Sequence, residues 1–219
     1  MIFLPISILF LIFLFIFLFI FLIFFIQFEV VKIALTKLGL PPIMAIVILI
    51  ASIIGSSINI PIHSKEVYTP VRQVQPFSFF APWKVPPIEN KQVLAVNVGG
   101  CLIPLLLVLY VFIKAPVWPT IFATVISVLI CHRLAHVVPG MGVVLSAFIP
   151  PVISVILAFM FSFKNRVPVA FISGVLGVLI GADLLNISNL GNYPGIMSIG
   201  GAGVYDGIFL VGIISAFLA

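Results

Sequence analysis

Charged residues are scarce in this chain of 219 residues, because Asp, Glu, Lys and Arg together make up 7% of it. Soluble domains have about 25% charged residues, so the composition excludes an ordinary soluble protein. The ten Lys and Arg residues are scattered between apolar runs and form no basic face, which argues against nucleic-acid binding despite a net charge of +5. Cysteine is equally scarce: Cys101 and Cys131 both lie in apolar runs and indicate neither a disulfide framework nor a CxxC metal site.

Apolar residues make up 63% of the chain and form runs long enough to cross a bilayer, which takes about 20 residues per helix. We therefore expect an all-α polytopic bundle of about seven transmembrane spans, held as a multi-pass protein in the plasma membrane. Charged residues or clusters of Pro, Gly and Asn separate the expected spans, which are 2–26, 40–62, 92–113, 117–137, 141–163, 168–187 and 199–219.

Two domains are predicted. Residues 1–39 form a Phe-rich transmembrane anchor and linker, because the first run is too long for a signal peptide and has no basic segment before it. Residues 40–219 form the polytopic domain. Its polar connection at 63–91 is rich in proline, which favours extended structure at the membrane interface.

Only two aspartates are present, and both fall inside predicted spans: Asp183 and Asp206. A carboxylate in lipid costs roughly 2.5–3.5 kcal/mol, so such residues usually face the interior of a bundle and serve a site. Two close carboxylates in a low dielectric share one proton, which allows one to act as an acid and the other as a base. The pair is therefore the predicted catalytic pair.

Small residues accompany both aspartates. Gly177 and Gly181 precede the first at GxxxG spacing, and Gly203 and Gly207 bracket the second, next to Tyr205. Such patterns let helix backbones approach closely. If the last two spans pack on these faces, the two carboxylates become neighbours, and the flanking residues become candidates for substrate or ion binding.

The elements Gly181-Ala182-Asp183 and Tyr205-Asp206 resemble the two motifs of intramembrane aspartyl proteases of the presenilin and signal-peptide-peptidase class. The resemblance implies hydrolysis of a transmembrane peptide. It covers only these positions, and the chain departs from the class in three ways. The order of the motifs is reversed, Ala182 stands in place of the second glycine, and no Pro-Ala-Leu follows.

Three asparagines collect in the same half of the membrane as the aspartates: Asn59, Asn97 and Asn186. Nearby Pro and Gly residues are expected to interrupt helices there, and interrupted helices expose carbonyls that transporters use to hold ions. The alternative function is therefore a proton- or cation-coupled transporter or channel-like protein, with the asparagines as neutral ligands. The uncharged stretch 187–201 would then act as a gate, or else form a plain turn.

His132 and His136 have i, i+4 spacing, which places two imidazoles on one face of a helix and can chelate Zn²⁺. An aspartate could complete such a site. Alternatively, the two histidines are hydrated or cap the last carbonyls of a helix. No other cofactor is expected.

A faint internal repeat sets the second and third spans beside the last two. Val98-Gly99-Gly100 then corresponds to Ile199-Gly200-Gly201, and the two units would run in the same direction. Chance similarity between Gly- and Ile-rich helices is the competing interpretation.

Four blocks together resemble an uncharacterised family of prokaryotic multispanning membrane proteins, a domain of unknown function, over roughly residues 40–219. The blocks are Ser57-Ile58-Asn59-Ile60-Pro61, Val96-Asn97-Val98-Gly99-Gly100, Gly181-Ala182-Asp183-Leu184-Leu185-Asn186 and 198–209. The resemblance implies an integral membrane protein and no particular reaction.

The sequence thus predicts an aspartyl intramembrane peptidase-like hydrolase first, a transporter second and a metal-assisted hydrolase third. A non-enzymatic structural membrane subunit is the remaining alternative. The expected partners are the lipid bilayer and either a transmembrane peptide or a small ion or solute. No nucleic-acid partner is expected.

Overall fold

Most of the chain is helical in the computed structural model, which describes residues 6–67, 91–138, 142–190, 195–201 and 207–219. The α-helices of this part are α1 (Ile6–Lys37), α2 (Pro42–Gly55), α3 (Ile103–Phe112), α4 (Val117–Leu134), α5 (Ile149–Phe161), α6 (Arg166–Leu176) and α7 (Gly207–Leu218). Helical segments of other pitch adjoin two of them: the π-helices η1 (Val98–Leu102) and η2 (Gly177–Asp183), and the 3₁₀-helix η3 (Leu184–Asn189).

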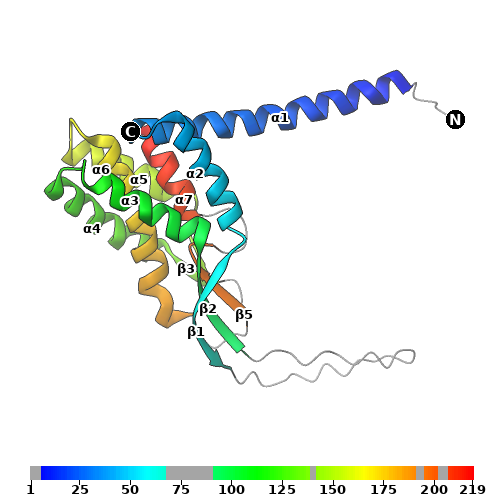
Figure 1. Cartoon of the computed structure of the whole chain (residues 1–219). Helices are drawn as coiled ribbons and strands as arrows, with labels where there is room; N and C mark the ends of the chain where they lie inside the picture. Colours follow the sequence, from blue (N-terminus) through cyan, green and yellow to red (C-terminus); the bar gives the residue numbers. More distant parts are fainter. Residues whose placement is uncertain (1–5, 68–90, 139–141, 191–194, 202–206) are drawn as a thin grey trace, which may run out of the picture.

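The all-α prediction is incomplete, because short strands lie at one end of the bundle (Figure 1). A three-stranded sheet has the order β1 (Asn59–Glu66), β2 (Lys91–Asn97), β5 (Gly195–Ile199), and β3 (His136–Val138) pairs with β4 (Gly142–Val144). The pair β1 and β2 is antiparallel, whereas β2 and β5 are parallel. Pro61 is tolerated because β1 is an edge strand, where a missing N–H donor is harmless.

Three helices of the described part are long and apolar enough to cross a membrane: Ile8–Lys37, Val117–Leu134 and Arg166–Asn189. The other apolar helices are shorter, and α2, with 14 residues, is about 21 Å long against a hydrocarbon core of about 30 Å. In several predicted spans the residues at the end of the bundle where the sheet lies form a strand and not a helix. The run from β2 through η1 to α3 has a summed rise along the chain of roughly 45 Å, and pairing in the sheet satisfies its strand backbone.

The centre of the bundle is α6, whose Phe171, Ile172 and Val175 are almost completely buried. It packs against α7, α4 and α5. By contrast, the side chains of α1 from residue 8 to residue 26 are exposed on every face, and Figure 1 shows α1 extending away from the bundle. A helix that is apolar all round needs lipid to cover it.

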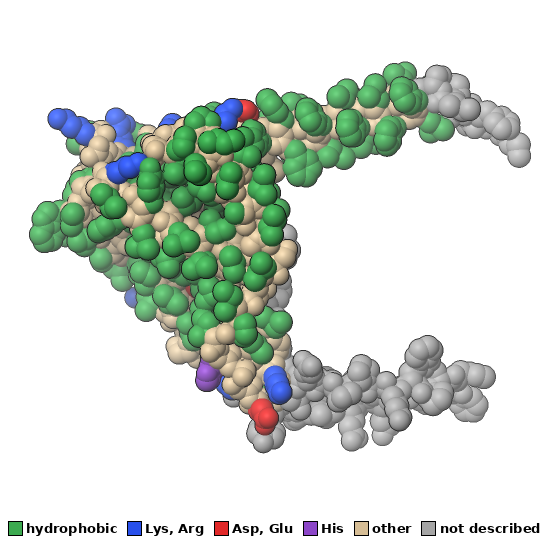
Figure 2. Space-filling view, in the orientation of Figure 1, with side chains coloured by type: hydrophobic (Ala, Val, Ile, Leu, Met, Phe, Trp, Pro, Cys, Tyr) green, Lys and Arg blue, Asp and Glu red, His purple; other side chains and the backbone are tan. Residues whose placement is uncertain are grey.

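Basic side chains gather at the end of the bundle where α1 joins it, which we call the lysine end. Here Lys37 Nζ donates to the carbonyl of Phe217 at 2.7 Å, and Lys114 Nζ donates to that of Leu38 at 3.3 Å. Both lysines thus bind carbonyls at or beyond the end of a helix, where cations are favoured. Figure 2 shows a largely hydrophobic surface between this end and the opposite one, which we call the sheet end.

Candidate functional site

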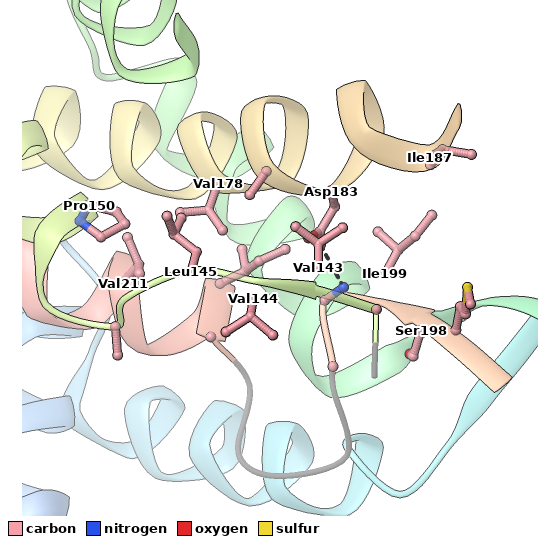
Figure 3. A pocket seen from close by; sticks show the side chains of 18 of the residues that line it. Val143, Val144, Leu145, Pro150, Val178, Asp183, Ile187, Ser198, Ile199 and Val211 are labelled. Atoms are coloured by element: carbon pink, nitrogen blue, oxygen red, sulfur yellow. Dashed lines mark hydrogen bonds between the residues drawn. The ribbon is translucent and has the colours of Figure 1, made fainter. Parts of the chain in front are cut away.

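Asp183 is the last residue of η2, and its half-buried carboxyl lies on the wall of a cavity of about 260 Å³. Oδ2 accepts a hydrogen bond from the backbone N–H of Gly200, just after β5, at 2.9 Å. Figure 3 shows the carboxyl pointing from the helix toward β5. Aliphatic residues form most of the remaining wall, among them Val143 of β4, Val178 of η2, Ile199 of β5 and Val211 of α7. The site is therefore a single described carboxyl in a mainly apolar cavity.

Two helices begin at this cavity. Pro150 of α5 and Gly207 of α7 both line it, and each lies in the first turn of its helix. The amino end of a helix carries a partial positive charge that stabilises an anion nearby. The helix ends therefore make the cavity more favourable for a negative charge than a purely apolar cavity would be.

A wide helical turn presents the carboxyl. The π-helix η2 interrupts the regular α-helical pattern, and such interruptions are frequent at functional sites. The buried amide of Asn186 donates to the carbonyls of Gly181 and Ala182 at 3.2 and 2.9 Å. The same Nδ2 lies 3.3 Å from His132 Nδ1, and Asn189 donates to Asn186 Oδ1 at 3.2 Å. Asn186 therefore stabilises the turn itself, whatever else it binds.

The two histidines do not share a helical face, so this part of the prediction is wrong. Helix α4 ends at Leu134, whereas His136 begins β3, is exposed and pairs with Val144 of β4. Only His132 is on the helix, because the chain becomes extended at Ala135. Among the residues that the structure describes, no group of three or more His, Cys, Asp or Glu side chains is placed to hold a metal ion.

Gly177 and Gly181 do permit a close helix approach, but the partner is α4 and not α7. A Cβ at Gly177 would overlap the hydroxyl of Ser127, and one at Gly181 would overlap the carbonyl of Val128. Helix α7 packs on another face of α6, where Gly212 makes the close approach. The contact that was expected to join the two aspartates therefore joins η2 to α4 instead.

Asn59 and Asn97 lie at directly opposed positions of β1 and β2. Asn97 Nδ2 donates to Asn59 Oδ1 at 3.1 Å and to the carbonyl of Ser56 at 2.7 Å, and its Oδ1 accepts from the N–H of Gly100 at 2.9 Å. Ser198 of β5 donates to Asn59 Oδ1 at 2.6 Å. The cluster links all three strands to the start of η1.

Three predicted site residues, Asp206, Tyr205 and Gly203, lie outside the described residues. The residues on either side of their segment, Gly201 and Gly207, both line the cavity that holds the first aspartate. Among the described residues, a Cβ at Gly207 would meet no atom within 4 Å.

Sequence reasoning missed the hairpin of β3 and β4, which supplies one wall of the cavity. The segment 141–163 reads as one apolar span, although Pro139-Gly140-Met141-Gly142 is a turn signal within the sequence of that hairpin. It also missed Gly200 as the hydrogen-bond donor to Asp183, because a backbone donor leaves no mark on the side-chain pattern.

Comparison with curated proteins gives no match, and comparison with solved structures gives none either. A family match covers residues 53–218, which includes the sheet, the cavity and every predicted site residue. The match lies within the range 40–219 over which the sequence resembles an uncharacterised family. The chain therefore belongs to the family described as "Protein of unknown function (DUF1614)".

Proposed function

We propose that this chain is a multi-pass protein of a prokaryotic plasma membrane, whose seven apolar segments all cross the bilayer. We further propose that Asp183 and Asp206 form an acid–base pair that hydrolyses a transmembrane peptide. One observation carries the proposal: the Asp183 carboxyl lines a cavity that is also lined by Gly201 and Gly207, the residues flanking the segment that contains Asp206. The resemblance to intramembrane aspartyl proteases supports the same assignment.

The proposed chemistry needs one water molecule between the two carboxyl groups. The ionised carboxylate removes a proton from this water as it attacks the peptide carbonyl, and the protonated carboxyl donates its proton to the developing oxyanion or leaving amine. The Gly200 N–H holds one oxygen of Asp183 in a fixed orientation. Apolar walls limit competing water, which strengthens electrostatic interactions inside the cavity.

The proximity of the two side chains can be tested without an activity assay. Two cysteines form a disulfide only when their Cα atoms are within about 7 Å. Asp183→Cys combined with Asp206→Cys should therefore oxidise to an intramolecular disulfide, whereas Asp183→Cys combined with Glu29→Cys, on α1, should not. If neither oxidation nor a short bifunctional thiol reagent crosslinks the first pair, the shared-proton mechanism is excluded.

Catalysis itself is tested on purified protein in lipid vesicles with labelled transmembrane peptides. Asp183→Asn and Asp206→Asn should each abolish cleavage, because neither amide can transfer the proton. Glu29→Gln is the matched control, since it removes a carboxylate that pairs with Lys32 at 2.6 Å far from the cavity. Cleavage that persists in Asp183→Asn would reject the proposal.

A second function, proton- or cation-coupled transport through the same aspartates, is favoured by one observation. The helix that carries Asp183 changes to π and then to 3₁₀ geometry at the cavity, as expected where backbone lines a polar site. Vesicles that contain a pH-sensitive dye would show an Asp183-dependent proton flux if this function holds. If Asp183→Asn changes neither flux nor cleavage, both functions are wrong.

A further inference from the structure

A second cavity, of about 440 Å³, lies at the sheet end and is not part of the site described above. Its polar lining comes from His63 and Lys65 of β1, Gln92 of β2 and Ser188 of η3. His63, Lys65 and Ser188 are exposed. Because four of its eight lining residues are polar or charged, this outer cavity is a place that water can occupy.

The outer cavity and the cavity of Asp183 have four lining residues in common: Leu94, Ile187, Leu190 and Met197. Two cavities that share walls from three different elements adjoin each other. The shared residues are all apolar, and Leu190 and Met197 are 8% and 5% exposed. They form an apolar boundary between the outer cavity and the cavity that holds the carboxyl.

The boundary is built by neighbouring strands. Leu94 of β2 lies opposite Met197 of β5 in the parallel ladder. The Gln92 amide donates to the sulfur of Met197 at 3.1 Å, which holds this flexible side chain across the boundary. A thioether has several accessible rotamers, so Met197 can move without disturbing the backbone.

We propose that the two cavities form one passage through which water from the sheet end reaches Asp183, and that the four shared residues are its constriction. The inference rests on the proposed function insofar as Asp183 must meet water to act as an acid or base. Hydrolysis uses this water as a reactant, and proton transport would use the same route. On the face that Figure 2 shows, hydrophobic side chains cover most of the described bundle between its two ends, and the polar residues of the sheet end lie beside the outer cavity.

Thiol labelling in vesicles with a charged, membrane-impermeant reagent tests the passage. Ile199→Cys places a thiol in the inner cavity, where the native side chain is 6% exposed, and Ser188→Cys places one in the outer cavity. Ile172→Cys lies in the core of α6 and serves as the unreactive control. Both native cysteines are buried, so the native chain gives the background. Ile199→Cys should react several-fold faster than Ile172→Cys.

Opposite changes at one constriction residue provide the decisive comparison. Leu190→Trp should slow labelling of Ile199→Cys several-fold, Leu190→Ala should accelerate it, and neither should change labelling of Ser188→Cys. Leu109→Trp is the matched control, because Leu109 is 61% exposed on α3, away from both cavities. Equal rates in the Trp and Ala variants, or an Ile199→Cys that reacts no faster than Ile172→Cys, would overturn the proposal.

Labelling uses no substrate, so its failure is distinguishable from failure of the proposed function. If labelling depends on residue 190 but neither aspartate supports cleavage or flux, the passage holds and the proposed function falls. If cleavage depends on Asp183 but labelling ignores residue 190, the passage alone is wrong.

Discussion

Two neighbouring strands of the sheet are each followed by a pair of glycines, and the two regions are used differently. After β2, Gly99 and Gly100 lie in η1, where α2 fills the space: a Cβ at Gly99 would overlap the carbonyl of Ser52. After β5, Gly200 and Gly201 border the cavity, and Gly207 at the start of α7 has no atom of the described part of the chain within 4 Å of an added Cβ. The first region is closed against a helix, whereas the second borders an open cavity at the carboxyl, although its glycines are themselves closely packed against Cys101 and Asn97.

The difference shows why only one of the two regions is a candidate site. In the first region the polar groups satisfy one another, since Asn97 bonds to Ser56, Asn59 and Gly100. In the second region a backbone N–H is directed at a side chain that also lines a cavity. The same pattern, a strand followed by two glycines, thus forms a rigid, closed turn after β2 and a turn that borders a cavity after β5.

The largest difference in stability is expected between two variants that each add one methyl group, Gly99→Ala in the first region and Gly207→Ala in the second. Gly99→Ala should destabilise the protein by more than about 3 kcal/mol or prevent folding, because the atoms in its way are backbone atoms of α2 that cannot rotate aside. Gly207→Ala should change stability by less than about 1 kcal/mol, since the space is open and alanine favours a helix. Unfolding in mixed micelles with a denaturing detergent measures both. Similar losses would contradict the contrast between the regions.

The next effect concerns Asn97. Asn97→Ala should cost about 2–4 kcal/mol, because it leaves the buried N–H of Gly100 without its acceptor and the Ser56 carbonyl without its donor. Asn97→Asp keeps the acceptor for Gly100 but turns a buried carboxylate oxygen toward the oxygens of Ser56 and Asn59, so its loss should be at least as large. The same unfolding assay measures both variants. A loss as small as that of a surface substitution would return Asn97 to the set of candidate ligands.

Much of the fold follows from the sequence, and the exceptions have physical reasons. The long apolar runs predict α1, α4 and the α6 segment, where length alone distinguishes a helix. The run Lys91–Asn97 is short, and periodicity cannot distinguish a short apolar strand from a buried helix. Strand pairing also depends on distant residues: Asn59 meets Ser198 across 139 positions, which no local pattern encodes.

Part of the candidate site could also be predicted from the sequence. The cost of placing a carboxylate in lipid predicts that Asp183 faces an interior space, and the structure puts it on a cavity. The GxxxG pattern predicts a close approach but carries no information about the partner, so α4 could not be distinguished from α7. The prediction that His136 lies on a helical face was wrong because α4 ends two residues before it.

A third prediction concerns the left-handed backbone beside the carboxyl. Gly200 has φ +83°, and a Cβ there would lie 2.7 Å from that of Cys101. Gly200→Ala should therefore cost about 2–3 kcal/mol, of which roughly 1–2 kcal/mol is conformational. Gly195 also has a positive φ, at +133°, but an added Cβ there would meet nothing within 4 Å in the part of the chain that is described, so Gly195→Ala measures the conformational part. Thermal unfolding of the two variants should differ accordingly. Equal losses would mean that Cys101 yields and the turn is less tightly packed than the cavity requires.

The smallest effect tests whether the closed region and the open region are joined. Ser198 borders the cavity and donates to Asn59, which in turn accepts from Asn97. Ser198→Ala should cost about 0.5–1.5 kcal/mol, the value of one hydrogen bond, whereas Ser188→Ala, at an exposed serine of the outer cavity, should have an effect within about 0.5 kcal/mol.

The double variant Ser198→Ala with Asn97→Ala measures the connection directly. Both side chains donate to the same oxygen of Asn59, so removing one leaves the other to hold it. The combined loss should exceed the sum of the two single losses by about 0.5 kcal/mol or more. Strict additivity would show that the closed region does not position β5. The orientation of Asp183 would then depend on Gly200 and its turn alone, and the search for positioning residues would move from the asparagines to the glycines.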